Sequence, residues 1–157
     1  MASIVEKMKD VLSARGKKSA SHLEQRQTLR KLIAATTENK LGPALHAKLL
    51  QQVVGLHFDE PASAEGYMPL HSWANCHDDI TQLFQLLANH KDLTIVGSVT
   101  EDAESLESSP YVLRGDVISF IERLDEEYTK SLRKIDPHTP DYVHRYGNCQ
   151  RQAWHGV

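Results

Sequence analysis

Apolar residues recur every three or four positions through the first 56 residues, which is the spacing of amphipathic α-helices. The pattern covers three segments, residues 4–12, 23–37 and 45–56. Gly16 would end the first segment, and Gly42 separates the second from the third. We therefore expect three helices joined by short connections.

Start signals lie beside the second and third segments. Ser19 or Ser21 can cap the second helix. Pro43 suits the first turn of the third helix, because its missing N–H donor would be unused there. The residues that we expect to face the core are Ile4, Val5, Met8, Val11, Leu12, Leu23, Leu29, Leu32, Ile33, Leu45, Leu49, Leu50, Val53 and Leu56.

The second half of the chain contains two further long helical patterns. Residues 57–69 hold two prolines and a glycine, which predicts a loop, and the fourth helix begins near Leu70. The fifth covers residues 112–135 and ends before Pro137, because the residue that precedes a proline is pushed away from helical geometry. Pro140 begins a short sixth helix. The two apolar stripes comprise Trp73, Cys76, Ile80, Leu83, Phe84 and Leu87, and then Val117, Ile118, Ile121, Leu124, Tyr128 and Leu132.

Two segments between the fourth and fifth helices lack this periodicity. Residues 93–96 are a short apolar run that could form a strand, but no partner strand is visible, so we prefer an extended linker or a buried turn. Residues 100–110 are acidic and rich in serine, which predicts a mobile surface loop. The fold class is therefore all-α, with helical hairpins stacked as a short solenoid-like repeat segment. No internal sequence repeat is visible, so a closed bundle is the alternative.

Composition places this fold among soluble proteins. The 157 residues are 40% hydrophobic and 25% charged, which is typical of globular domains. Cys76 and Cys149 lie far apart and outside any paired motif, which favours the reducing cytosol over a disulfide framework. No segment approaches the roughly 20 apolar residues of a membrane span, and the N-terminus lacks the apolar core of a signal peptide. We expect a cytoplasmic protein without a membrane partner.

The charges are unevenly distributed along the chain. Residues 1–58 carry ten basic and four acidic side chains, whereas residues 59–112 carry one basic and ten acidic side chains. Residues 113–157 carry seven of each. This asymmetry suggests an oriented contact surface, and the alternative is a set of solvated faces.

Residue types that support catalysis are present, but not in a catalytic pattern. Phosphate-binding glycine loops and nucleophile elbows are absent from the sequence. Cys76, His77 and Asp79 lie almost consecutively on a predicted helix and point in different directions, so they cannot form a triad among themselves. We expect Cys76 to pack in the core and His77 to face water. We identify no catalytic residue and no cofactor site.

A metal site is also not expected. His138, His144, Cys149 and His155 are separated by six, five and six positions, which matches no familiar zinc pattern.

One basic cluster is a candidate contact for a partner or for an RNA backbone. It consists of Arg15, Lys17 and Lys18, and no aromatic residues are interleaved with it. It therefore indicates weak backbone contact and gives no support to sequence-specific RNA reading.

Residues 114–138 form a long block of mixed charged and apolar residues, from Arg-Gly-Asp-Val-Ile-Ser-Phe to Lys-Ile-Asp-Pro-His. This block resembles the c subunit of eukaryotic translation initiation factor 3. Residues 14–18, 39–42 and 139–145 and the Tyr67-Met68 pair ahead of Trp73 resemble it too, in the same order. The resemblance covers roughly residues 11–145. Its marker residues are Arg114, Gly115, Glu122, Arg123, Asp125, Glu126, Asp136, Pro137 and His138.

The resemblance implies a non-catalytic scaffold role. In that family, helical repeats lead into a winged-helix domain, and this chain corresponds to repeats upstream of that domain. It would pack against other subunits near the small ribosomal subunit and support preinitiation complex assembly and scanning. The alternative is a free-standing helical adaptor, or a truncated regulator, that competes for a factor subunit.

The resemblance also divides the chain into two parts. Residues 1–145 form the helical-repeat segment. Residues 146–157 do not continue the charged helix of the family, so we expect a divergent, poorly ordered tail in which Trp154 packs on little.

Overall fold

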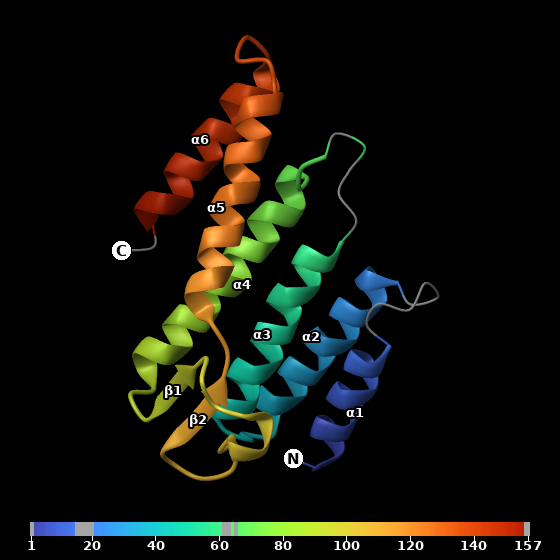
Figure 1. The fold of residues 1–157 in the computed structure, drawn as a ribbon, viewed down its shortest axis with the longest axis vertical. Coiled ribbons are helices and arrows are strands. Elements are labelled where there is room, and N and C mark those ends of the chain that lie inside the picture. Colours follow the sequence, from blue (N-terminus) through green and yellow to red (C-terminus); the bar gives the residue numbers. More distant parts are fainter. Residues whose placement is uncertain (1, 15–20, 61–63, 65, 156–157) are drawn as a thin grey trace.

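Helices dominate the structure, a computed structural model that describes residues 2–14, 21–60, 64 and 66–155, apart from the side chains at 101 and 148–155. The helices are α1 (Ala2–Ser13), α2 (His22–Glu38), α3 (Pro43–Asp59), α4 (Leu70–Asn89), α5 (Val117–Lys134) and α6 (Pro140–His155). They lie side by side in chain order, and from α1 to α5 each packs against the next (Figure 1). This confirms the prediction of a mostly α-helical stack.

The centre of the stack is α3, which begins with Pro43 as predicted. A helix that is apolar around most of its circumference can be buried on several sides. On one side, Leu45, Leu49, Val53 and Leu56 pack with residues of α1 and α2. Other faces contribute to a second core with α4 and the strands and to a third core with α4 and α5. The buried stripe expected for this helix is confirmed.

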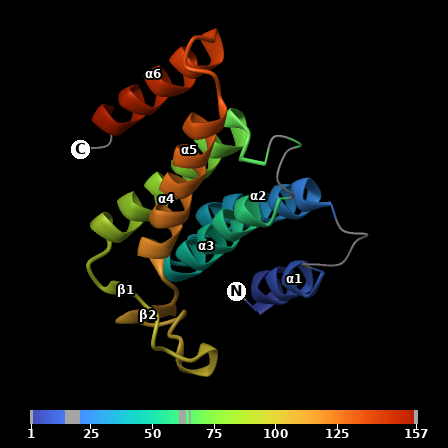
Figure 2. The same ribbon diagram turned by 45° about the horizontal axis from the view of Figure 1, so that its top comes forward.

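A pair of parallel strands interrupts the helical order. Leu93–Val96 forms β1 and Tyr111–Arg114 forms β2, with Leu93 opposite Tyr111 and Val96 opposite Arg114. The interpretation of residues 93–96 as a linker is therefore wrong. The partner strand lies 18 positions further along the chain, where the sequence pattern suggested a helix. Figure 2 shows the strand pair at one end of the stack, where α4 ends and α5 begins.

The start of α5 also differs from the prediction. The helix begins at Val117 instead of residue 112, because the preceding residues belong to β2 and to a short connection through Gly115. A Cβ atom at Gly115 would overlap the side-chain amide of Gln51 and the Ile95 Cγ2 atom, so both side chains would have to move to accommodate any other residue here. The marker residue Arg114 is thus in a strand and not in the helix.

Four residues expected to face the core are exposed. They are Leu23 on α2, Phe84 on α4, and Ile118 and Ile121 on α5, the most exposed being Ile118 at 67%. Their helical spacing is regular, but the neighbouring helices cover only the adjacent part of each apolar stripe. On α5 the buried positions are Leu124 and Ser131.

The C-terminal helix is longer than predicted, since α6 runs from Pro140 to His155. Trp154 lies in the part of α6 whose side chains are outside the described residues. Among the described helices, none is both long enough and apolar enough to cross a membrane.

Candidate functional site

A buried ion pair connects α3 to the acidic segment between the strands. Lys48 Nζ donates to Glu104 Oε2 at 2.7 Å, and the two side chains are only 9% and 5% exposed. Glu104 Oε1 also accepts from the backbone N–H of Arg114 at 2.8 Å. The segment 100–110, predicted to be a mobile loop, is therefore anchored at its centre.

A second polar connection lies between α2, α3 and α4. The Asp79 carboxylate is almost fully buried, and its Oδ2 atom lies 2.8 Å from Arg30 Nη2 and 2.9 Å from His57 Nε2. A buried carboxylate requires such partners, because an unpaired charge in the interior is strongly unfavourable. The sequence contained one signal for this arrangement: Asp79 follows Cys76 by three residues and so shares the buried face of α4.

A third polar connection lies at the C-terminal end of α3. Arg26 Nη2 lies 2.6 Å from Glu60 Oε1, and Ser72 Oγ donates to Glu60 Oε2 at 3.3 Å. Burial alone would raise the pKa of Glu60, but the hydrogen bond and the charge of Arg26 outweigh it and lower the pKa below its ordinary value. Glu60 is therefore ionised at neutral pH.

All three ion pairs join a basic residue of segment 1–58 to an acidic residue of segment 59–112. The charge asymmetry of the sequence is thus used, at least in part, inside the fold. Both interpretations of that asymmetry, as an external contact surface or as solvated faces, miss this role.

The geometry around Cys76 does not suit nucleophilic chemistry. Burial raises the pKa of the Cys76 thiol to about 12, and the nearby Asp79 carboxylate acts in the same direction. The thiolate needed for attack is therefore scarce at neutral pH. Cys76 is fully buried, as predicted. His77 was expected to face water, but it stacks on the Trp73 ring at 5.5 Å and its side chain is 27% exposed.

Tyr67 and Met68 form a short segment, here called the strap, that contacts both α5 and α6. The Met68 N–H donates to Glu127 Oε2 at 2.9 Å, and Arg145 Nη1 on α6 donates to the Met68 carbonyl at 3.3 Å. The Arg145 guanidinium also lies over the Tyr67 ring, 5.1 Å from its centroid. Next to the strap, Trp73 Nε1 donates to the Leu124 carbonyl at 3.1 Å.

The marker residues of α5 do not form one cluster. Arg123 lies 4.4 Å from the centroid of the Phe58 ring, and Glu126 pairs with Lys130 at 3.3 Å. Glu122 and Asp125 are exposed.

The end of the marker block forms the turn between α5 and α6. The Asp136 carboxylate accepts from the His138 N–H at 2.9 Å, and the Asp136 carbonyl accepts from Thr139 Oγ1 at 2.7 Å. Asp136, Pro137 and His138 are exposed. Their role in the structure is therefore to reverse the chain.

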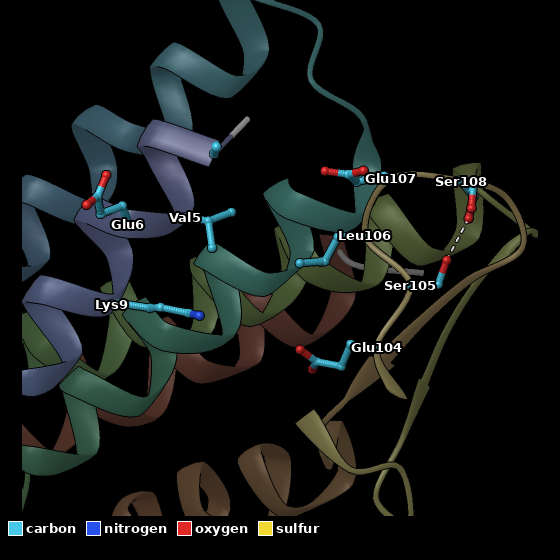
Figure 3. Close-up of a pocket in the computed structure, with 9 residues that line it drawn as sticks. Val5, Glu6, Lys9, Glu104, Ser105, Leu106, Glu107 and Ser108 are labelled. Atoms are coloured by element: carbon cyan, nitrogen blue, oxygen red, sulfur yellow. Dashed lines mark hydrogen bonds between the residues drawn. The ribbon is translucent and has the colours of Figure 1, made fainter. Parts of the chain in front are cut away.

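A hollow of about 690 Å³ lies between α1 and the anchored acidic segment. Figure 3 shows Val5 and Leu106 extending into it from opposite sides, with Lys9 and Glu104 below them. Ser105 Oγ, on the rim, donates to the Ser108 carbonyl at 2.8 Å. Because Glu104 is already paired with Lys48, the charges available to a partner are those of Glu6, Lys9 and Glu107. This mixed polar and apolar lining suits a protein contact better than a small ligand. Sequence reasoning did not find it, since its two walls lie about a hundred residues apart.

The predicted basic cluster of Arg15, Lys17 and Lys18 lies outside the described residues. Among those that are described, no group of three or more His, Cys, Asp or Glu side chains could hold a metal ion.

These features define a mostly α-helical stack, tied across its helices by buried ion pairs. The sequence model of the family described as eukaryotic translation initiation factor 3 subunit 8 N-terminus matches residues 1–151. This chain therefore belongs to the family of the c subunit of eukaryotic translation initiation factor 3. The match confirms the resemblance and extends it six residues, 146–151, into the segment expected to diverge.

Individual members of the family are similar in sequence to this chain. The c subunit of eukaryotic translation initiation factor 3 from Anopheles gambiae is 35% identical over 142 residues, covering 90% of this chain and 15% of the relative. The protein of the same name from Danio rerio is 32% identical over 142 residues, covering 89% and 15%. That from Neurospora crassa is 35% identical over 153 residues, covering 91% and 17%. The chain thus spans about a sixth of the length of these relatives.

Proposed function

We propose that this chain is a non-catalytic scaffold segment of the translation initiation factor 3 complex. In this role it packs against other subunits, acts in the cytoplasm, and supports preinitiation complex assembly on the small ribosomal subunit and scanning. The observation that carries the proposal is the family match over residues 1–151. This range includes α1 to α5 and most of α6.

The physical design of the stack supports a scaffold role. Three buried or partly buried ion pairs connect helices α2, α3 and α4 and the acidic segment, and polar ties of this kind resist sliding of one helix past another. At the same time, large apolar side chains remain exposed on α5 and α6, notably Ile118, Val143 and Tyr146. Val143 and Tyr146 lie three positions apart and so share one face of α6, and adjacent exposed apolar side chains are a feature of partner contacts.

The experiment is affinity capture of the tagged chain from a eukaryotic cell extract, followed by sucrose-gradient sedimentation. We expect other subunits of the factor and proteins of the small ribosomal subunit to be enriched together. A chain that is absent from both the factor and the small-subunit fractions would contradict the proposal. Enrichment of a single factor subunit without small ribosomal subunits would favour the competing adaptor.

Two groups of surface variants identify the contacting face in the same assay. Glu107→Lys alters the hollow beside α1, whereas Val143→Ser with Ile121→Ser makes exposed apolar positions of α6 and α5 polar. All three positions are exposed, so the variants should keep the fold. Loss of capture in one group and not in the other assigns the scaffold contact to that face.

A further inference from the structure

One edge of the two-stranded sheet is open. The Tyr111 N–H donates to the Asp92 carbonyl at 2.8 Å, and the Gly115 N–H donates to the Val96 carbonyl at 3.2 Å. Backbone groups alternate in direction along a strand, so the N–H and C=O of Ile95, which lies between these acceptors, point to the opposite edge of β1. Within the described residues, the sheet has two strands and nothing pairs with that edge.

A groove of about 640 Å³ lies beside this strand. All four residues of β1 line it, together with Leu87 at the end of α4 and the start of α5. Ile118 lines the groove and is 67% exposed, so an apolar side chain stands next to unpaired backbone groups. This combination offers main-chain hydrogen bonds and a pocket for side chains along the same line.

The open strand lacks the usual protection. Edge strands are commonly blocked by a lysine, a proline or a bulge, which prevents another chain from pairing with them. β1 reads Leu-Thr-Ile-Val and is in regular register with β2 along its whole length. Apart from its short length of four residues, nothing in the strand opposes the addition of another strand.

The groove has a definite charge. Among the residues that line it, Asp116 is the only one with a charged side chain. Hydrogen bonds from Ser119 Oγ and the Ser119 N–H lower the pKa of the Asp116 carboxyl, so the groove carries one negative charge and no positive one at neutral pH. A basic residue on the occupant would complement it.

The short length of the β1 edge favours a short extended segment over a second copy of the chain as its occupant. A four-residue strand is roughly 13 Å long, whereas a stable interface between two folded proteins buries about 1,200–2,000 Å² in total. Pairing of two copies along β1 would therefore need a much larger contact than this edge provides. A short extended segment can bind by adding a strand, with hydrogen bonds giving affinity and pockets for alternate side chains giving specificity.

We propose that the open edge of β1 and the adjoining groove are a docking site for an extended segment of a partner protein. The segment lies beside β1 as a third strand and places alternate apolar side chains in the groove, next to Ile118. A lysine or arginine of the segment faces Asp116. This interaction goes beyond the scaffold role. Its test uses purified components, so the result does not depend on whether the scaffold proposal holds.

The test uses two synthetic, end-blocked hexapeptides, Lys-Val-Thr-Val-Thr-Val and Val-Thr-Val-Thr-Val-Lys, which cover the two possible strand directions. Each is titrated into the isotope-labelled full chain and followed by nuclear magnetic resonance. We expect one of them to shift the amide signals of Ile95 and Gly97 more than those of Thr94 and Val96, which already face β2. Absence of any shift at these amides with both peptides would overturn the proposal.

Methylation of the peptide backbone separates strand addition from simple apolar binding, and it leaves the protein unchanged. In an added strand, alternate N–H groups face β1. Methylating one alternate set should therefore weaken binding at least tenfold, while methylating the other set should leave it within about twofold. Equal effects of the two sets would contradict the docking mode.

Three variants test the groove. Ile118→Ser should weaken binding, whereas Ile121→Ser, an exposed residue of the same helix that does not line the groove, should not. Asp116→Asn keeps a good N-cap residue but removes the charge, so it should weaken the lysine peptide about threefold to fivefold and leave a peptide with glutamine in place of lysine unchanged. If concentration-dependent dimers protect the same amides without peptide, the edge belongs to a second copy and the proposal is wrong.

Discussion

Glu104 reaches back across the fold to Lys48, placing its Oε2 atom 2.7 Å from the lysine Nζ atom in a site where both side chains are almost fully buried. The two residues are 56 positions apart. This contact fixes the segment between the strands against α3 and gives the buried Lys48 ammonium a counter-charge.

Replacing one partner of this pair should destabilise the chain strongly. Glu104→Gln leaves the Lys48 ammonium buried without a counter-charge, and we expect the free energy of unfolding to fall by about 3 kcal/mol. Urea denaturation followed by circular dichroism measures the change. Glu107→Gln, an exposed acid in the same segment, should shift the value by less than about 0.5 kcal/mol.

The double variant Lys48→Met with Glu104→Gln distinguishes a lost charge pair from lost packing. Because it removes the unpaired charge as well, it should recover at least half of the stability that Glu104→Gln loses. A double variant as unstable as Glu104→Gln would show that the loss does not come from an uncompensated charge on Lys48.

Asp79 should be equally sensitive, although it resembles a surface acid in the sequence. Asp79→Ala leaves the buried His57 ring without its partner and releases Arg30, which predicts a loss of about 3 kcal/mol in the free energy of unfolding. Its neighbour Asp78 is the matched control, since its side chain is 63% exposed and Asp78→Ala should change little. Similar effects of the two substitutions would contradict the assigned role of Asp79.

The Cys76 thiol should make the protein less stable at alkaline pH. Its pKa is raised from 9.0 to about 12, so between these values the unfolded chain releases a proton that the folded chain retains. Fewer protons on the unfolded state mean that the free energy of unfolding falls as the pH rises through this window. The contribution is fully present below pH 9. At pH 10.5 the loss should be on the order of 2 kcal/mol.

The measurement compares unfolding at pH 8 and pH 10.5 in a Cys149→Ser background, with and without Cys76→Ala. The alanine variant should lose less stability over this interval, since tyrosines and lysines titrate in both chains. In the same background, a thiol reagent at pH 8 should react with Cys76 only when the chain is unfolded. Rapid reaction of the folded chain would show that the thiol is accessible.

Arg145 should control the attachment of α6. Arg145→Ala removes the donor to the Met68 carbonyl and uncovers the Tyr67 ring, which predicts a loss of about 1–2 kcal/mol and faster proteolysis in the turn at residues 136–139. Arg145→Lys keeps the charge but not the planar group, so it should recover only part of this loss. Arg133→Ala, at an exposed position of α5, should leave the proteolysis rate unchanged.

Local patterns predicted the helices well, because helical burial depends on residues three and four positions apart. The stripe of α3 and the proline at its start illustrate this. The strands were missed for the opposite reason: Leu93 and Tyr111 are neighbours only in space, and a short apolar run does not indicate its partner. Val112 and Leu113 continue the helical spacing of α5, so periodicity alone extended that helix too far.

The polar connections were harder to predict, because acidic residues such as Glu104 and Asp79 are usually exposed and their residue type does not indicate burial. Their burial follows from which helix covers them, and that depends on the whole stack. The exposed residues Leu23 and Ile118 are the converse case. An apolar stripe indicates which face is suited to burial, but it does not indicate whether a neighbour covers it.

The strap at Tyr67 and Met68 has a consequence for the order of folding. The N–H and C=O of Met68 bond to residues 59 and 77 positions later in the chain, so they stay unpaired until α5 and α6 are in place. The ion pairs among α2, α3 and α4 do not require α5 or α6 to be in place. Because the amide donates to Glu127 of α5, hydrogen exchange at Met68 should report, through a single signal, when α5 attaches to the stack and how often it detaches.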